Sequence, residues 1–254
     1  MSPRVEVVDL WKRFRLYHER HYTLKTALLR LGRGSYEDLW VLRGVSFAVA
    51  AGEAVALVGP NGTGKSTLLG LIGRVYRPTR GTTRVYGRLS TLLELGAGFH
   101  PELTGLENIL LNGAILGMSR REVRQKQDAI IAFAELEKFI DVPLRNYSQG
   151  MIMRLGFSVA VHSDPEVMLV DEVLAVGDDH FQAKCYQRIE TLQQEGCAIL
   201  FVSHEMDVVR RVATRVLWLS GGQIRGDGPA SQVVPAYLAS FHTRQNTPPG
   251  GGDI

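Results

Sequence analysis

The apolar residues of this chain fall into two patterns. Short, mostly apolar runs lie at 54–58, 166–170 and 197–202, and such runs are typical of strands buried on both faces of a sheet. Between these runs, apolar residues recur three or four positions apart, which predicts amphipathic helices. Strands that alternate with helices in this way predict an α/β fold whose core sheet is mainly parallel.

Other elements complete this core. Residues 5–10 and 41–50 are predicted strands, and the alternation around a Gly-Gly pair predicts a β-hairpin over 216–228. Polar residues rich in proline and glycine follow at 243–254, and we expect a flexible tail there. Helices are predicted at 65–73, 148–162, 179–195 and 231–242.

One mainly helical stretch interrupts the alternation of strands and helices. Residues 105–140 are predicted to be mostly helical, with a new helix starting at Ser119, because Ser119 and Glu122 form a capping-box pattern. Together with the helix that follows, this stretch predicts an inserted helical subdomain over about 100–163. The remainder of residues 1–242 forms the main part of the domain.

The segment 59–67 has the pattern G-x-x-x-x-G-K-[ST] between a predicted strand and a predicted helix. Its glycines let the backbone turn tightly, so amide N–H groups and the helix N-terminus can hold phosphates. Lys65 would reach the β- and γ-phosphates, and Ser66 would bind Mg²⁺. ATP and Mg²⁺ are therefore the expected cofactors. The expected contact residues are Gly59, Pro60, Asn61, Gly62, Thr63, Gly64, Lys65, Ser66 and Thr67.

Two carboxylates, Asp171 and Glu172, follow the apolar run at 166–170. A buried strand would deliver both to one edge of the sheet. Asp171 suits the Mg²⁺ shell, since Mg²⁺ keeps several waters and few carboxylates. Glu172 suits a general base for an attacking water. The pair therefore predicts ATP hydrolysis rather than nucleotide storage.

A second possible phosphate site lies at the start of the helix at 148–162. Ser148 is a good N-cap, and Gly150 permits close approach of a ligand to the backbone. A helix N-terminus with a hydroxyl and bare amides can hold an anion. Because one chain needs a single phosphate cradle, this second site makes sense if it serves the nucleotide of another protomer.

The motifs "GPNGTGKST", "YSQGM", "VMLVDE" and "FVSHE", in this order and spacing, resemble those of the ATP-binding cassette (ABC) ATPases. The resemblance covers nearly the whole chain. It implies a P-loop ABC ATPase fold: a RecA-like mixed sheet core, an N-terminal antiparallel β-subdomain and an inserted α-helical subdomain. It also implies a head-to-tail dimer that encloses two ATP molecules.

The resemblance assigns roles to further residues. Ser148, Gln149 and Gly150 would grip the γ-phosphate of the partner's ATP. His204 would be the switch histidine that hydrogen-bonds the γ-phosphate, and Asp178 would be the acid of the loop that contacts the opposite protomer.

An aromatic side chain near the N-terminus is expected to stack on the adenine. Phe14 stands where the family places this residue, and Tyr17 is the alternative. Either ring would serve, because adenine needs an aromatic face more than a specific hydrogen bond. The alternative interpretation, in which Phe14 is an aromatic residue of the core, stays open.

Two departures from the family pattern point to one of its branches. The signature is Tyr-Ser-Gln-Gly-Met at 147–151 instead of Leu-Ser-Gly-Gly-Gln, and residues 92–99 lack the usual glutamine that senses Mg²⁺ and water. Glu94 is the nearest polar substitute and a candidate metal ligand. With the segment "LLELGAGFHPELTGLENI" at 92–109, these features resemble the ATPase subunits that export O-antigen, teichoic acid and some capsules. The alternatives are another ABC transport branch or a soluble, non-transport ABC ATPase.

The composition limits which classes of binding partner are expected. The net charge of +3 does not suggest nucleic acid, and the chain contains no apolar run of transmembrane length. The expected partners are a second copy of the chain and a polytopic membrane permease, also in two copies, which would make most of the glycan contacts. We therefore expect a peripheral protein at the cytoplasmic face of the inner membrane.

Residues 11–38 are rich in arginine, lysine, histidine and aromatic side chains. Within them, leucines at 24, 28 and 31 predict a short amphipathic helix at about 22–31 with a basic face. This helix has two interpretations: it lies against the membrane or the transporter mouth, or it covers the cassette.

Overall fold

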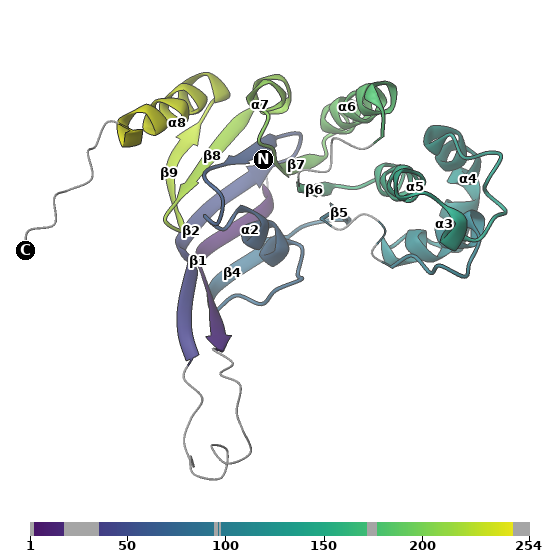
Figure 1. The fold of residues 1–254 in the computed structure, drawn as a ribbon, viewed down its shortest axis with the longest axis horizontal. Helices are drawn as coiled ribbons and strands as arrows, with labels where there is room; N and C mark the ends of the chain where they lie inside the picture. The colour runs from purple at the N-terminus through teal and green to yellow at the C-terminus, as the bar shows by residue number, and fades with distance from the viewer. Residues whose placement is uncertain (1–2, 18–35, 94–95, 97, 172–176, 246–254) are drawn as a thin grey trace, which may run out of the picture.

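The chain forms two sheets with helices around them and a separate group of helices at one end (Figure 1). The helix expected at about 22–31 lies outside the described residues, as does most of the expected tail. The computed structural model describes residues 3–17, 36–93, 96, 98–171 and 177–245.

The larger sheet is the core of the molecule. Within the described residues its strand order is β5-β6-β7-β3-β8-β9, and all neighbouring pairs are parallel except the β8–β9 hairpin. The continuous apolar runs become its central strands to within one residue, which confirms the prediction from their pattern. The strands are β3 (Ala54–Val58), β5 (Leu89–Leu92), β6 (Val167–Asp171), β7 (Ala198–Val202), β8 (Arg215–Ser220) and β9 (Gln223–Gly228).

The smaller sheet is antiparallel, with strand order β2-β1-β4 in the described part of the chain. β1 (Pro3–Tyr17) and β2 (Tyr36–Ala50) are longer than the predicted strands, because their polar outer halves continue to pair beyond the apolar segments. β4 (Arg80–Val85) and β5 were not predicted. β4 carries mostly polar, exposed residues, and β5 is only four residues long, so neither has a clear apolar period.

Helices cover the larger sheet on both faces. α2 (Lys65–Ile72) and the antiparallel sheet share a buried core with one face. The second buried core holds α5 (Gln149–Val161), α6 (Asp179–Gln194), α7 (Met206–Val212) and α8 (Ala230–Gln245). The seven-residue α7 was not predicted, and α8 ends three residues beyond the expected position.

The predicted helical subdomain is present between β5 and β6. It contains α3 (Gly105–Ile115), α4 (Arg120–Ala134), the short helix η1 (Leu144–Asn146) and α5. Its own buried core includes Ile109, Val123 and Ile130. The predicted capping box of Ser119 and Glu122 is confirmed at the start of α4. A second capping box, formed by Thr104 and Glu107 at the start of α3, was missed.

Asn108 holds the entry to this subdomain in place. Its side chain is fully buried. The Oδ1 atom accepts a hydrogen bond from the His100 N–H at 2.7 Å, and Nδ2 lies 2.9–3.1 Å from the carbonyl oxygens of His100, Leu103 and Thr104. One buried amide side chain therefore ties together four backbone groups of the loop that leads into α3.

Replacing Asn108 by leucine, which has a similar shape, should destabilise the protein by about 2 kcal/mol, because the His100 N–H loses its hydrogen-bond acceptor and three further hydrogen bonds of a buried side chain are lost. Urea denaturation followed by circular dichroism measures this free energy. Asn146→Leu, at an exposed position of η1, is the matched control and should change it by less than about 0.5 kcal/mol. Equal effects of the two substitutions would contradict the role given to Asn108.

Candidate functional site

The parallel pairing of three strands brings the predicted site together. Val202 of β7 is in register with Leu57 of β3 on one side and with Asp171 of β6 on the other. Parallel strands end at the same edge of a sheet. The phosphate loop after β3, the acid at the end of β6 and the segment after β7 therefore emerge side by side.

The phosphate loop is pressed against two neighbouring strands. Gly59 has φ 151°, and a Cβ built there would lie 2.2 Å from the Leu219 carbonyl oxygen of β8. Gly64 has φ 101°, and a Cβ there would lie 2.8 Å from Leu42 Cδ2 of β2. Both positions need glycine because of backbone conformation and close packing. The loop is thereby held tightly at the start of α2.

Lys65, the first residue of α2, lies across this loop. Its side chain is buried, and Nζ donates hydrogen bonds to the carbonyl oxygens of Gly59 at 2.8 Å and Pro60 at 3.1 Å. Thr63 Oγ1 also donates to Pro60, at 2.8 Å. The ammonium group is thus held over the loop where the motif places phosphates.

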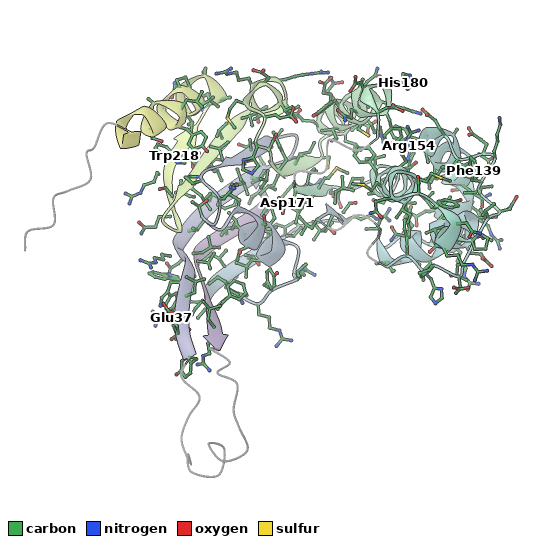
Figure 2. The ribbon with its side chains drawn as sticks, viewed as in Figure 1. Glu37, Phe139, Arg154, Asp171, His180 and Trp218 are labelled. Atoms are coloured by element: carbon green, nitrogen blue, oxygen red, sulfur yellow. The ribbon has the colours of Figure 1, made fainter. Side chains whose placement is uncertain are left out.

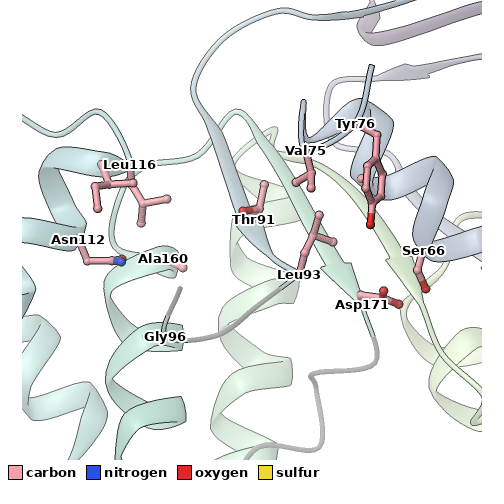
Figure 3. A pocket seen from close by; sticks show the side chains of 13 residues that line it. Ser66, Val75, Tyr76, Thr91, Leu93, Gly96, Asn112, Leu116, Ala160 and Asp171 are labelled. Atoms are coloured by element: carbon pink, nitrogen blue, oxygen red, sulfur yellow. The ribbon is translucent and has the colours of Figure 1, made fainter. Parts of the chain in front are cut away.

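A cavity of about 330 Å³ lies between α2 and the helical subdomain. Ser66 and Asp171 line it at one end, and Asn112 and Leu116 of the helical subdomain line it at the other (Figure 3). Asp171 Oδ1 is buried and has no hydrogen-bond partner among the described residues. An orphaned carboxylate oxygen in the same cavity as a serine hydroxyl fits Mg²⁺, which prefers a few oxygen ligands and retains its waters.

The apolar part of the cavity extends to the surface of the molecule. Val75 and Tyr76, in the loop after α2, are 62% and 40% exposed, and Ile115 of α3 is 59% exposed; all three line the cavity. Gly96, with φ 89°, also lines it. Val75 and Tyr76 were not predicted to be site residues. The only feature of the sequence that could have indicated them is a pair of large apolar residues between two arginines.

Phe14 lies on β1 close to the phosphate loop. Two positions earlier, Lys12 is in register with Leu42, the residue that contacts Gly64. The Phe14 ring packs edge-on against Tyr76, with 5.5 Å between centroids, and Lys12 Nζ lies 4.7 Å from its centroid. The ring is half-buried, so it can present an aromatic face. The alternative, Tyr17, ends β1, but its side chain lies outside the described part of the structure.

The second predicted phosphate site is at the N-terminus of α5. Ser148 caps the helix, and its Oγ accepts a hydrogen bond from the Met151 N–H at 3.2 Å. Ser148 and Gln149 are exposed, and Gly150 is half-buried. None of the three lines the cavity that contains Ser66 and Asp171. Within one chain they form a separate exposed surface.

Asp178 takes part in a network of hydrogen bonds and ion pairs that was not predicted from the sequence. It caps α6, because Oδ1 accepts a hydrogen bond from the Phe181 N–H at 2.9 Å. Arg154 Nη2 of α5 lies 2.7 Å from Asp178 Oδ2, and Arg154 Nη1 lies 3.0 Å from Glu135. The Phe181 amide, followed by the Arg154 charge, lowers the pKa of the Asp178 carboxyl. Figure 2 shows Arg154 on α5.

His204 follows β7 at the same sheet edge as the phosphate loop and is exposed. Glu172, the predicted base, and Glu94, the predicted substitute for glutamine, lie outside the described residues, so their predicted roles stay predictions. Among the helices described here, none has the length and apolar character needed to cross a bilayer.

Solved structures with this fold include an ATP-binding subunit of an ABC transporter, at 22% identity and a TM-score of 0.75 over 96% of this chain and 99% of that one. Another is a dimeric ATP-binding cassette in a post-hydrolysis state bound to ADP and Pi. That structure matches at 23% identity and a TM-score of 0.70, over 89% of this chain and 98% of its own.

Relatives are also found by sequence. The O-antigen export system ATP-binding protein RfbB of Klebsiella pneumoniae is 45% identical, over 93% of this chain and 98% of that protein. The RfbB of Myxococcus xanthus is also 45% identical, and the match spans 97% of this chain but 60% of that protein. The teichoic acids export ATP-binding protein TagH of Bacillus anthracis is 36% identical, over 93% of this chain and 43% of that protein.

The family model described as "ABC transporter" matches residues 42–175, which include the phosphate loop, the helical subdomain and Asp171. This match covers more than half of the chain, and the K. pneumoniae relative covers nearly all of it. The chain therefore belongs to the ABC transporter family.

Proposed function

We propose that this chain is the ATP-hydrolysing subunit of a transporter that exports a lipid-linked cell-surface polysaccharide, such as O-antigen or teichoic acid. The observation that carries the proposal is the cavity at the sheet edge, where Ser66 and the orphaned oxygen of Asp171 lie beside the phosphate loop. Relatives named as O-antigen and teichoic acid export proteins support the choice of branch.

The residues at this edge suit phosphoryl transfer to water. Backbone amides of the phosphate loop would hold the phosphates, and the Lys65 ammonium would neutralise their charge. Ser66 and Asp171 would hold Mg²⁺, which would neutralise the negative charge that develops on the phosphates during hydrolysis. Glu172 would accept the proton of the attacking water, and His204 would donate a hydrogen bond to the γ-phosphate.

The proposed active unit contains two copies of the chain. The exposed N-terminus of α5, with Ser148, Gln149 and Gly150, does not line its own chain's cavity. It is therefore available to the ATP of a second copy. A helix N-terminus with bare amide N–H groups attracts phosphate. Head-to-tail closure of two chains would complete both sites.

The proposed membrane partner docks at the apolar mouth of the cavity. Val75, which follows α2, and Ile115, at the end of α3, are large, apolar and more than half exposed, and both line this cavity. A short helix of a polytopic permease, present in two copies, would cover them. The chain would then lie at the cytoplasmic face of the inner membrane, and the permease would make most of the glycan contacts.

Substituting Glu172 by glutamine should leave ATP binding intact and reduce hydrolysis at least 100-fold, because the base that activates water is lost. Size-exclusion chromatography with ATP should then show a trapped dimer, and phosphate release gives the rate. Glu102→Gln, at an exposed glutamate paired with Arg145, is the control and should hydrolyse normally. Near wild-type hydrolysis by the Glu172 variant would show that the base is elsewhere.

Arg154 is expected to position the proposed dimer contacts. Arg154 lies on α5, the helix that Ser148 caps, and its guanidinium forms an ion pair with Asp178. Asp178 is six residues after Glu172 in the sequence. Arg154→Met should lower kcat for ATP about 10-fold with little change in KM, because Lys65 and the phosphate loop are untouched. Arg145→Met removes an exposed ion pair with Glu102 and is the control. If Arg154→Met keeps kcat within twofold, the ion pair has no role in turnover.

A further inference from the structure

Helix α4 has three faces with different surroundings. Val123 and Ile130 pack into the core of the helical subdomain. On a second face, Glu122 pairs with Arg88 at 3.0 Å, and Lys126 donates to the His162 carbonyl at 2.8 Å and pairs with Asp164. These contacts attach α4 to the main domain. The third face points away from both and carries the remaining charged side chains of the first two turns.

We call this third face the arginine surface; it consists of Arg120, Arg121, Arg124 and Gln125. These four residues line a hollow of about 500 Å³. All four are exposed. Their positions on a helix of 3.6 residues per turn place them on a continuous arc next to Val123.

The three guanidinium groups have no acidic partner within the described parts of the chain. None of them forms an ion pair or a side-chain hydrogen bond with any residue that the structure describes. Asp128, one turn beyond Arg124, forms no ion pair with it. Glu122, in the same turn, accepts hydrogen bonds from Ser119 and Arg88, which lower the pKa of its carboxyl to about 2. Its negative charge is therefore directed away from the arginine surface.

Three like charges at the start of a helix repel one another and oppose the helix dipole. An anion on the arginine surface would reverse both effects. Guanidinium groups form paired hydrogen bonds with phosphate oxygens and are more weakly hydrated than ammonium groups. Of the residues that the structure describes, only these three arginines and Gln125 line the hollow, so it offers no aromatic or aliphatic side chain of the kind that anchors a docked protein segment. Phosphate groups need only the charge.

We propose that the arginine surface binds the phosphate groups of anionic lipid headgroups. The proposal rests on the proposed function only in placing the chain at a membrane; it does not depend on ATP hydrolysis. Each arginine near an anionic bilayer increases binding about fivefold, so the three together contribute roughly 100-fold. Such contacts would hold the helical subdomain at the bilayer surface beside the permease.

The test is co-sedimentation of the full chain with vesicles of phosphatidylcholine containing 30% phosphatidylglycerol, and with pure phosphatidylcholine. The variant R120Q/R121Q/R124Q should lose about 100-fold in partition onto the anionic vesicles, and neither protein should bind the neutral ones. The control R77Q/R80Q/R225Q removes the same charge from exposed arginines elsewhere. It should lose less than threefold. ATPase activity should be unchanged in both variants, and R120Q/R121Q/R124Q should unfold at a temperature no lower than that of the parent chain, because it removes like-charge repulsion at the start of α4.

Four results would overturn the proposal. Equal losses in the two variants would mean that net charge alone drives binding. Full retention by R120Q/R121Q/R124Q would place lipid binding elsewhere, for example in residues 18–35. If R120Q/R121Q/R124Q still binds the vesicles but no longer co-purifies with the permease, the ligand of the arginine surface is an acidic protein segment. If 10 mM inorganic phosphate displaces the protein from vesicles at constant ionic strength, the surface binds free phosphate rather than headgroups.

The proposed function is tested separately, by the ATPase activity of the parent chain and by its co-purification with the permease.

Discussion

Parallel pairing of β3, β7 and β6 is the constraint on which the site depends. Parallel strands have their carboxyl ends at one edge, and the register aligns Leu57, Val202 and Asp171 there. The phosphate loop follows β3, His204 follows β7, and the acid pair begins at Asp171, the last residue of β6. No local feature of any one segment would bring them together. Burial of all residues of β3 and β7 fixes this order, because displacement of either strand would expose a continuous apolar surface.

The two parts of the domain are joined by α5. Phe157 and Val161 of this helix belong to the core beneath the larger sheet, whereas Leu155 and Val159 belong to the core of the helical subdomain. One helix thus packs into both cores, while its N-cap residue, Ser148, is exposed. Close packing on both sides resists independent movement of the helix. A displacement at the cavity is therefore expected to reach Ser148 through a stiff element.

Fold class and the phosphate loop could be predicted because each depends on a local pattern. Continuous apolar runs revealed the central strands, and the glycine and lysine spacing revealed the loop. β4 and α7 were missed because their stability comes from pairing and packing rather than from an apolar period. The contacts of Asp178 with Arg154 and of Asn108 with the loop at 100–104 were also missed. Arg154 and Asp178 are 24 residues apart, and the sequence around each of them does not indicate which residue it pairs with.

Asp178 shows why a family pattern and a structure give different views of one residue. The resemblance assigns its carboxylate to the opposite protomer, whereas the geometry gives one oxygen to the Phe181 amide and the other to Arg154. The two assignments are compatible, since an ionised carboxylate has about four acceptor positions and these bonds use two. The side chain is 64% exposed, which leaves room for a second copy of the chain. Arg154 therefore holds Asp178 in one orientation before any partner arrives, and a contact made by an already ordered side chain loses less conformational entropy on association.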